Sequence, residues 1–177
     1  MGILAASLLA IMQQAMLLQG SAAPPAPTPP NPCAAEEFAA FDFWVGEWEV
    51  YQTGTETQVA TSRIEKVSNG CAVRETWMPL RGGGGSSLTT LDPQTGTWHQ
   101  LWVGGQPGRV FFEGGPVDGA MVLTGYWGQD AEGRANLVRM IYTLGEDGSV
   151  RQHGEASVDH GQTWGPSFDL TYRPKEG

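Results

Sequence analysis

The stretch FDFWVGEWEV, residues 41–50, decides the fold expected for this chain. In its second half, Gly46 and Trp48 alternate with Glu47 and Glu49, so that one face is apolar and the other is charged. This period of two predicts a strand with one side turned toward a core. A Trp in such a first strand most often plugs the closed end of a small barrel, and contact with a ligand is the alternative interpretation of Trp48.

Aromatic residues precede this strand at helical spacing. Phe38, Phe41 and Trp44 follow one another at intervals of three residues. This spacing predicts one or two short helical turns over residues 34–44. We expect the aromatic turns to lie against Trp48.

Downstream, short segments of alternating polarity are separated by turn residues. The chain holds 25 Gly and 12 Pro, which suit many turns better than long helices. No helical pattern long enough for a parallel crossover lies between the segments. The sequence therefore predicts an all-β, antiparallel up-and-down barrel of about ten strands with a short N-terminal helical turn, and a β-sandwich with Greek-key crossovers is the alternative. The predicted strands are 46–53, 58–68, 71–79, 85–92, 97–104, 108–114, 119–128, 134–145, 148–158 and 167–173.

Turn chemistry marks the connections. Asn69-Gly70 predicts a two-residue hairpin. Residues 157–164 read SxDxGxTW, which resembles the Asp-box of sialidases and related propellers, a hairpin whose Asp side chain caps the turn while the Trp packs beneath it. A propeller needs several blades and this chain has one copy of the motif, so we expect a hairpin and no glycosidase activity.

Charge and the N-terminal segment indicate export. Ten Lys and Arg against nineteen Asp and Glu give a formal net charge of −9, and residues 1–35 carry no charged side chain. Residues 1–23 have the apolar run and small residues of a signal peptide, although the alternative is an uncleaved anchor. Residues 24–35 form a proline-rich linker ahead of a barrel domain at 36–174. We expect an exported protein, periplasmic or secreted, with no membrane span after leader cleavage, whose acidity disfavours nucleic acid as a partner.

Cys33 and Cys71 are the two cysteines of the chain. In an oxidising compartment, a disulfide between them would stabilise the fold by about 3 to 4 kcal/mol. Two buried free thiols are the alternative. No second Cys or His stands at ligand spacing, so we expect no metal site.

Polar residues recur on apolar strand faces further along the chain. Gln100 lies between two tryptophans in the run WHQLWV, and Glu75, Arg139 and Gln152 each alternate with apolar residues. If these faces point inward, a few polar groups line an aromatic lumen, which is the composition of a small-ligand cavity. The alternative is a filled barrel in which Glu75 and Arg139 pair with each other or face solvent. The predicted ligand contacts are Trp48, Glu75, Trp77, Gln100, Trp102, Arg139, Tyr142 and Gln152.

No catalytic motif stands out. The sequence contains no GxSxG elbow. His99, His153 and His160 each lack a second ligand at chelating spacing. We therefore expect no catalytic residues, no cofactor and no metal.

Several segments together resemble a bacterial family of exported, lipocalin-like proteins. They are FDFWVGEWEV, CAVRETW, WHQLWV, EGGPVDGAMVLTG and RQHGEASVDHGQTWGPSFDLTYR, and the FDFWxGEW opening is the most specific of them. The resemblance spans residues 36–174. It implies a calycin-type barrel whose first strand carries Gly46-Glu47-Trp48 at the closed end, and it implies no reaction. A more distant similarity to nitrobindin-type haem barrels ends at this motif, because Val50 and Gln52 stand where those proteins continue with glycines.

Three functional hypotheses follow. The first is a binding protein that holds a small apolar or amphipathic molecule in the lumen. The second is a calycin-fold enzyme, an isomerase or hydratase, in which Glu75 and Arg139 act as acid, base and charge stabiliser. The third is a filled barrel that acts through its outer surface. The presence and lining of a cavity would distinguish them.

Overall fold

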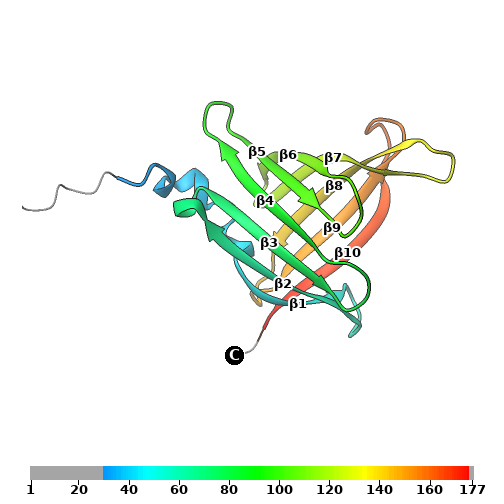
Figure 1. Ribbon diagram of the computed structural model, residues 1–177, viewed down its shortest axis with the longest axis horizontal. Coiled ribbons are helices and arrows are strands. Elements are labelled where there is room, and N and C mark those ends of the chain that lie inside the picture. Colours follow the sequence, from blue (N-terminus) through cyan, green and yellow to red (C-terminus); the bar gives the residue numbers. More distant parts are fainter. Residues whose placement is uncertain (1–29, 176–177) are drawn as a thin grey trace, which may run out of the picture. The chain divides into compact units, whose positions relative to one another are not determined.

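Ten antiparallel strands close into a barrel in the computed structural model, which describes residues 30–175 (Figure 1). Turn residues at short intervals leave room only for hairpins, and the alternating segments between them become the strands. The strands are β1 (Gly46–Gln52), β2 (Gln58–Val67), β3 (Ala72–Pro79), β4 (Gly85–Asp92), β5 (Thr97–Val103), β6 (Val110–Val117), β7 (Ala120–Gln129), β8 (Ala135–Leu144), β9 (Val150–Ser157) and β10 (Gly165–Pro174).

Each strand pairs with its neighbours in sequence, and the first strand closes the sheet by pairing with the last. Trp48 of β1 lies opposite Ser62 of β2 on one side and Pro174 of β10 on the other. Closure leaves none of the ten described strands with an unpaired edge. The predicted up-and-down barrel is confirmed, and the alternative of a β-sandwich with Greek-key crossovers is wrong.

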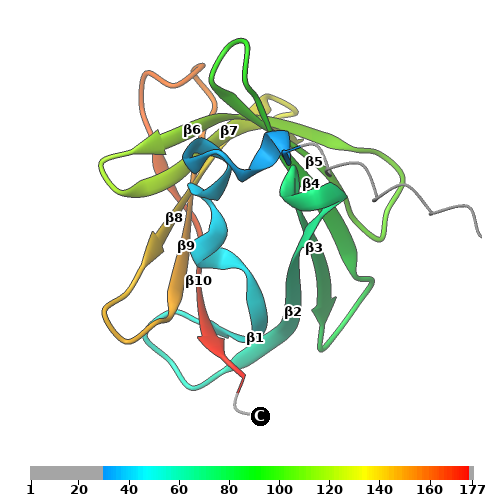
Figure 2. The same ribbon diagram turned by 90° about the vertical axis from the view of Figure 1, so that its left-hand side faces the viewer.

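Three 3-10 turns precede the barrel: η1 (Pro32–Ala34), η2 (Glu36–Ala39) and η3 (Asp42–Trp44). They lie across one end of the barrel (Figure 2). The rings of Phe41 and Trp44 are fully buried and stack with their centroids 4.9 Å apart. The indole N–H of Trp48 donates to the Trp44 carbonyl oxygen over 2.9 Å. The helical turns predicted over residues 34–44 therefore form an aromatic plug, and Trp48 belongs to it.

A disulfide between Cys33 and Cys71 ties this plug to the loop between β2 and β3, as predicted, with the Cα atoms 5.0 Å apart. The amide of Asn31 reinforces the connection by donating to the Asn69 carbonyl oxygen over 2.7 Å. The predicted linker over residues 24–35 thus ends in a segment, residues 31–35, that is fastened to the barrel. The predicted signal peptide, residues 1–23, lies outside the described residues.

The β2–β3 connection differs from the two-residue hairpin expected at Asn69-Gly70. Val67 pairs with Ala72, which leaves a loop of residues 68–71 containing the 3-10 turn η4 (Ser68–Gly70). Asn69 and Gly70 both have positive φ, as a tight turn requires, but Ser68 has positive φ as well, at 53°. The turn chemistry was therefore recognised correctly, whereas the loop length was wrong.

The hairpin joining β9 to β10 has the construction predicted from SxDxGxTW. The Asp159 carboxylate accepts hydrogen bonds from the Ser157 hydroxyl (2.6 Å) and from both the hydroxyl (2.6 Å) and the backbone N–H (2.9 Å) of Thr163. These bonds hold the pKa of Asp159 well below its usual range. The Trp164 indole closes the turn by donating to the Gly161 carbonyl oxygen over 3.1 Å.

Candidate functional site

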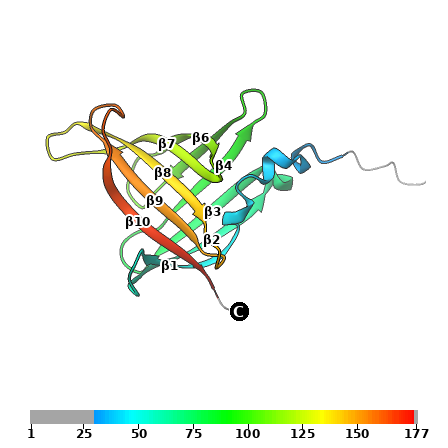
Figure 3. The ribbon, with the colours of Figure 1, turned by 180° about the vertical axis from the view of Figure 1, so that it is seen from behind.

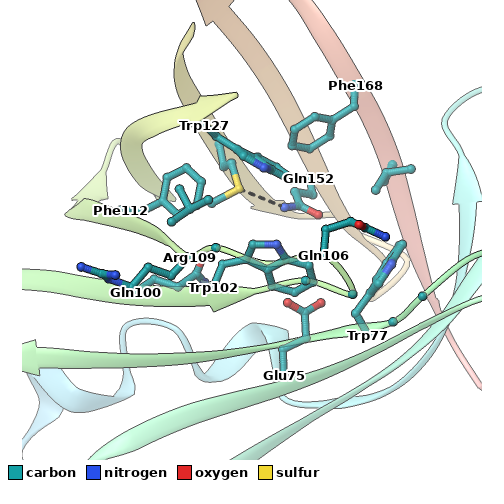
Figure 4. A pocket seen from close by; sticks show the side chains of 18 of the residues that line it. Glu75, Trp77, Gln100, Trp102, Gln106, Arg109, Phe112, Trp127, Gln152 and Phe168 are labelled. Carbon is teal, nitrogen blue, oxygen red and sulfur yellow. Dashed lines mark hydrogen bonds between the residues drawn. The ribbon is translucent and has the colours of Figure 1, made fainter. Parts of the chain in front are cut away.

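A cavity of about 500 Å³ occupies the barrel at the end away from the plug. Its mouth is formed by the loop joining β3 to β4, at Gly83 and Gly84, and by residues 104–109 between β5 and β6. Such a volume falls within the range of small-molecule sites. The side chains that line it come mainly from β3, β5, β6 and β7 to β10 (Figure 4), and they are Glu75, Trp77, Gln100, Trp102, Gln106, Pro107, Arg109, Val110, Phe112, Trp127, Met140, Tyr142, Gln152, Phe168, Leu170 and Tyr172.

The outer part of the cavity is aromatic. Trp127 of β7 is 40% exposed and lies at the rim. Its ring centroid is 6.4 Å from that of Trp102, 6.1 Å from Phe112 and 6.3 Å from Phe168, the last two in edge-to-face arrangement. Edge-to-face rings at these distances attract one another and present apolar walls to a guest. This part of the cavity suits a flat or branched apolar group.

Two of these rings rest on glycines of the neighbouring strand. A Cβ atom on Gly85 would lie 2.5 Å from the Trp102 ring, and one on Gly154 would lie 2.4 Å from the Phe168 ring. The missing side chains let the rings lie against the barrel wall, where a larger residue would push them inward. The sequence therefore keeps the lumen open by pairing bulky residues with glycines.

The inner part of the cavity is polar and centres on Glu75 of β3. Its carboxylate oxygens accept hydrogen bonds from the hydroxyls of Ser62 (3.1 Å), Ser87 (3.3 Å) and Tyr172 (3.4 Å). The side chain is buried, and burial raises its pKa to about 7, against the opposing effect of these hydrogen bonds. Among residues 30–175 no Lys, Arg or His forms an ion pair with it.

A chain of neutral groups extends from Glu75 across the floor. The Tyr172 hydroxyl shares its one proton between Glu75 at 3.4 Å and the closer Gln152 side-chain oxygen at 2.8 Å, and the Gln152 amide donates to the Tyr142 hydroxyl over 2.9 Å. The same amide lies 3.3 Å from the Met140 sulfur (Figure 4). Burial and the nearby Glu75 charge raise the pKa values of both tyrosines well above 10, so they remain protonated at neutral pH. Gln100 is fixed separately by donating to the Thr89 hydroxyl over 2.9 Å.

Most of the predicted ligand contacts lie together around this cavity. Glu75 and Trp77 enter it from β3, and the remaining ones are Gln100, Trp102, Tyr142 and Gln152. Trp48 does not line the cavity, because it is part of the aromatic plug at the other end of the barrel. Its interpretation as the closure of the barrel agrees with the structure.

Arg139 was predicted to contact a ligand in the lumen, but its side chain lies outside the barrel. It lies on the outer face of β8, one of the strands nearest the viewer in Figure 3. There its guanidinium donates to Glu155 over 2.6 and 2.9 Å and covers the Trp164 ring at 4.2 Å. The predicted lumen position of Arg139, and its alternative pairing with Glu75, are therefore both wrong. Both faces of β8 carry apolar residues, so alternation alone did not distinguish inside from outside.

Four aromatic lining residues and one basic residue were missed by the sequence reasoning. Phe168 and Tyr172 alternate with Leu170 in the run SFDLTY, so the period of two was visible there. Trp127 lies within the register shift between Tyr126 and Gln129 in the β7–β8 pairing, which breaks the alternation that would have placed it. Phe112 follows an exposed Phe111 on the same strand, which masked the inward face, and Arg109 lies in a loop, where no pattern applies.

Other site types find little support in the residues present. Over residues 30–175 no three His, Cys, Asp or Glu side chains are grouped in a way that could hold a metal ion. None of the three histidines lines the cavity, so the lumen offers no imidazole for a haem iron. Among the helical segments in this described part of the chain, none is long and apolar enough to cross a membrane.

The fold and cavity define the class of protein: a closed ten-stranded antiparallel barrel, plugged at one end, with a cavity that could hold a ligand. No protein-family model and no curated protein matches the sequence significantly.

Proposed function

We propose that this protein is an exported binding protein that holds a small, largely apolar molecule in its barrel. The observation that carries the proposal is the cavity of about 500 Å³, with aromatic walls near the mouth and a compact polar floor. Binding sites for small molecules combine these features, because apolar walls supply affinity while a few polar groups fix orientation. The alternative hypothesis, a filled barrel that acts only through its outer surface, does not account for this cavity.

Two further features support export and a lipocalin-like role. The Cys33–Cys71 disulfide fits an oxidising compartment. The segment FDFWVGEWEV, through which the chain resembles exported lipocalin-like proteins, forms the plug and first strand that close the barrel in the manner the resemblance implies.

The test is a ligand screen on the full-length mature protein, with a matched pair of variants. Leu170→Trp fills the lumen, whereas Leu101→Trp adds the same side chain to the exposed outer face of β5. Binding of fatty acids, retinoids and apolar amines would be followed by calorimetry and tryptophan emission, and native mass spectrometry would search for co-purified molecules. Binding that survives Leu101→Trp and is lost in Leu170→Trp supports the proposal. If no ligand binds and no species co-purifies, the proposal fails.

Acid–base catalysis at Glu75 is a second candidate, favoured by one observation. A carboxyl group with a pKa of about 7 exchanges its proton readily at neutral pH, which suits a general acid or base. Arg139 has no part in such a reaction, because it lies outside the barrel. Titration of Glu75 by NMR tests this candidate, and a midpoint near the ordinary value of 4.5 would remove its basis.

A further inference from the structure

The acidic and basic side chains that line the cavity lie at opposite ends of it. Glu75 is the acidic side chain in its lining and lies at the buried floor, whereas Arg109 is the basic one and lies at the exposed mouth. The Arg109 guanidinium is also engaged, because it sits 5.1 Å from the centroid of the Phe111 ring on the outer face. A ligand that enters this cavity therefore meets aromatic walls first and a single buried carboxyl group last.

We propose, on the basis of the binding function above, that the ligand is an organic amine that enters head first. Its ammonium group lies against Glu75, and its apolar body fills the aromatic part of the cavity between Trp102, Phe112, Trp127 and Phe168. A small primary or secondary amine with one aromatic or branched apolar group matches both parts of the site.

The hydrogen bonding of Glu75 leaves room for such a head group. Its present partners are three neutral hydroxyls at 3.1 to 3.4 Å, and a carboxylate offers about four acceptor positions. Figure 4 shows the carboxylate pointing from β3 into the cavity, toward the rings of Trp77 and Trp102. An ammonium group at this point gains charge-assisted hydrogen bonds and faces aromatic rings, both of which favour a cation.

Other ligand charges fit less well. At pH 8, a carboxylate at the floor would meet the charge of Glu75, and one held at the mouth by Arg109 would direct an apolar tail onto the polar groups of Glu75, Gln152 and Tyr172. Those groups would keep their hydrogen bonds to one another, but the buried Glu75 carboxylate would be left with neutral hydroxyl partners and no water or cation, which is costly for a buried charge. The net charge of −9 also attracts cations and repels anions at long range.

Glu75 is the group on the floor that changes charge near neutral pH. The neighbours that face it are Ser62 on β2, Ser87 on β4, Tyr172 on β10 and, one step further, Tyr142 on β8. The serines do not titrate, and burial raises the pKa values of both tyrosines well above 10. An ammonium ion favours the carboxylate form of Glu75, so binding at pH 6 releases a proton to solvent.

The experiment compares three probes of one shape: 4-phenylbutylamine, 4-phenylbutan-1-ol and 4-phenylbutyrate. Their dissociation constants would be measured by calorimetry for the wild type, Glu75→Gln and the control Glu113→Gln, whose carboxylate lies exposed on the outer face of β6. We expect the amine to bind the wild type about tenfold or more tightly than the alcohol at pH 8, since a charged hydrogen bond contributes more than a neutral one. Glu75→Gln removes this preference and Glu113→Gln keeps it.

A second measurement follows the proton. In weakly buffered solution at pH 6, a pH-stat should record close to one proton released for each amine bound to the wild type and none for Glu75→Gln. The affinity for the amine should rise from pH 5 to pH 8, whereas that for the alcohol should stay constant.

The outcomes separate this inference from the binding function. If the alcohol binds as tightly as the amine and Glu75→Gln changes neither, the barrel binds small molecules but the inference is overturned. If 4-phenylbutyrate binds best and Arg109→Gln weakens it, the ligand is an anion held at the mouth and the inference is again overturned. If none of the probes binds, the inference fails, and the binding function is decided by the ligand screen alone.

Discussion

Replacing Glu75 with Gln should stabilise the empty barrel at alkaline pH and leave it almost unchanged in acid. The buried carboxyl group has a pKa of about 7, compared with 4.5 for an ordinary Glu in the unfolded chain. Because the folded state holds this proton more tightly, Glu75 costs nothing below pH 4.5 and destabilises the fold progressively as the pH rises through 7. The difference between the two pKa values corresponds to about 3 kcal/mol above pH 8.

Gln has nearly the same shape but cannot ionise. Its amide oxygen can accept from Ser62 and Tyr172 as one carboxylate oxygen of Glu75 does, and its amide N–H can donate to the Ser87 hydroxyl, which is free to rotate and accept. The variant's free energy of unfolding should therefore match that of the wild type at pH 4 and exceed it by about 3 kcal/mol at pH 8. Urea unfolding followed by circular dichroism, repeated at half-unit steps from pH 4 to pH 8.5, measures the difference between the two proteins. Other titrating groups contribute equally to both and cancel in the comparison.

The control is Glu113→Gln, which removes an exposed carboxylate and should follow the wild type at every pH. A constant difference between wild type and Glu75→Gln over the whole range would show that Glu75 is not protonated preferentially in the folded barrel. A wild type that is more stable than Glu75→Gln at pH 8 would show that the carboxylate is favoured there, and the reasoning from burial would be refuted.

Three further perturbations have defined outcomes. Replacing Cys33 and Cys71 with Ser should lower the free energy of unfolding by about 4 kcal/mol, because the bridge spans 38 residues, and equal urea midpoints for the double variant and the oxidised wild type would contradict this. Gly154→Ala places a Cβ atom 2.4 Å from the Phe168 ring and should cost about 1 to 3 kcal/mol in thermal unfolding, whereas Gly165→Ala meets no atom within 4 Å and should be nearly neutral. Asp159→Asn weakens the cap of the β9–β10 hairpin and should speed hydrogen exchange at the Gly161 and Thr163 amides, which Asp118→Asn in another turn should leave unchanged.

Much of the strand layout could be predicted from the sequence, because the signals that specify it are local. Gly-containing turns and alternating segments placed all ten strands within a few residues of their observed bounds. The Asp159 hairpin could be predicted in detail, since its hydrogen bonds join residues that are neighbours in the chain. Only the predicted length of the loop that contains η4 was wrong. The register of β2 against β3 sets where strand pairing ends, and the turn residues do not reveal that register.

The candidate site was predictable where one strand face is clearly apolar. Trp77 and Gln100 were placed in the lumen on that basis, together with Glu75. Arg139 was not, because both faces of β8 carry apolar residues, and a shift of one residue turns every side chain to the opposite face.

The sequence by itself determined that this protein is a barrel, where its strands turn, and that it carries an aromatic plug, because alternation and turn chemistry act over a few residues. Only the tertiary structure decided that the lumen is open and that Glu75, at its floor, has no counter-ion among residues 30–175. Both facts depend on residues far apart in the chain: Trp102 resting on Gly85, Phe168 on Gly154, and Arg139 turned outward to Glu155. Contacts of this kind are set by closure of the sheet, which brings β1 against β10.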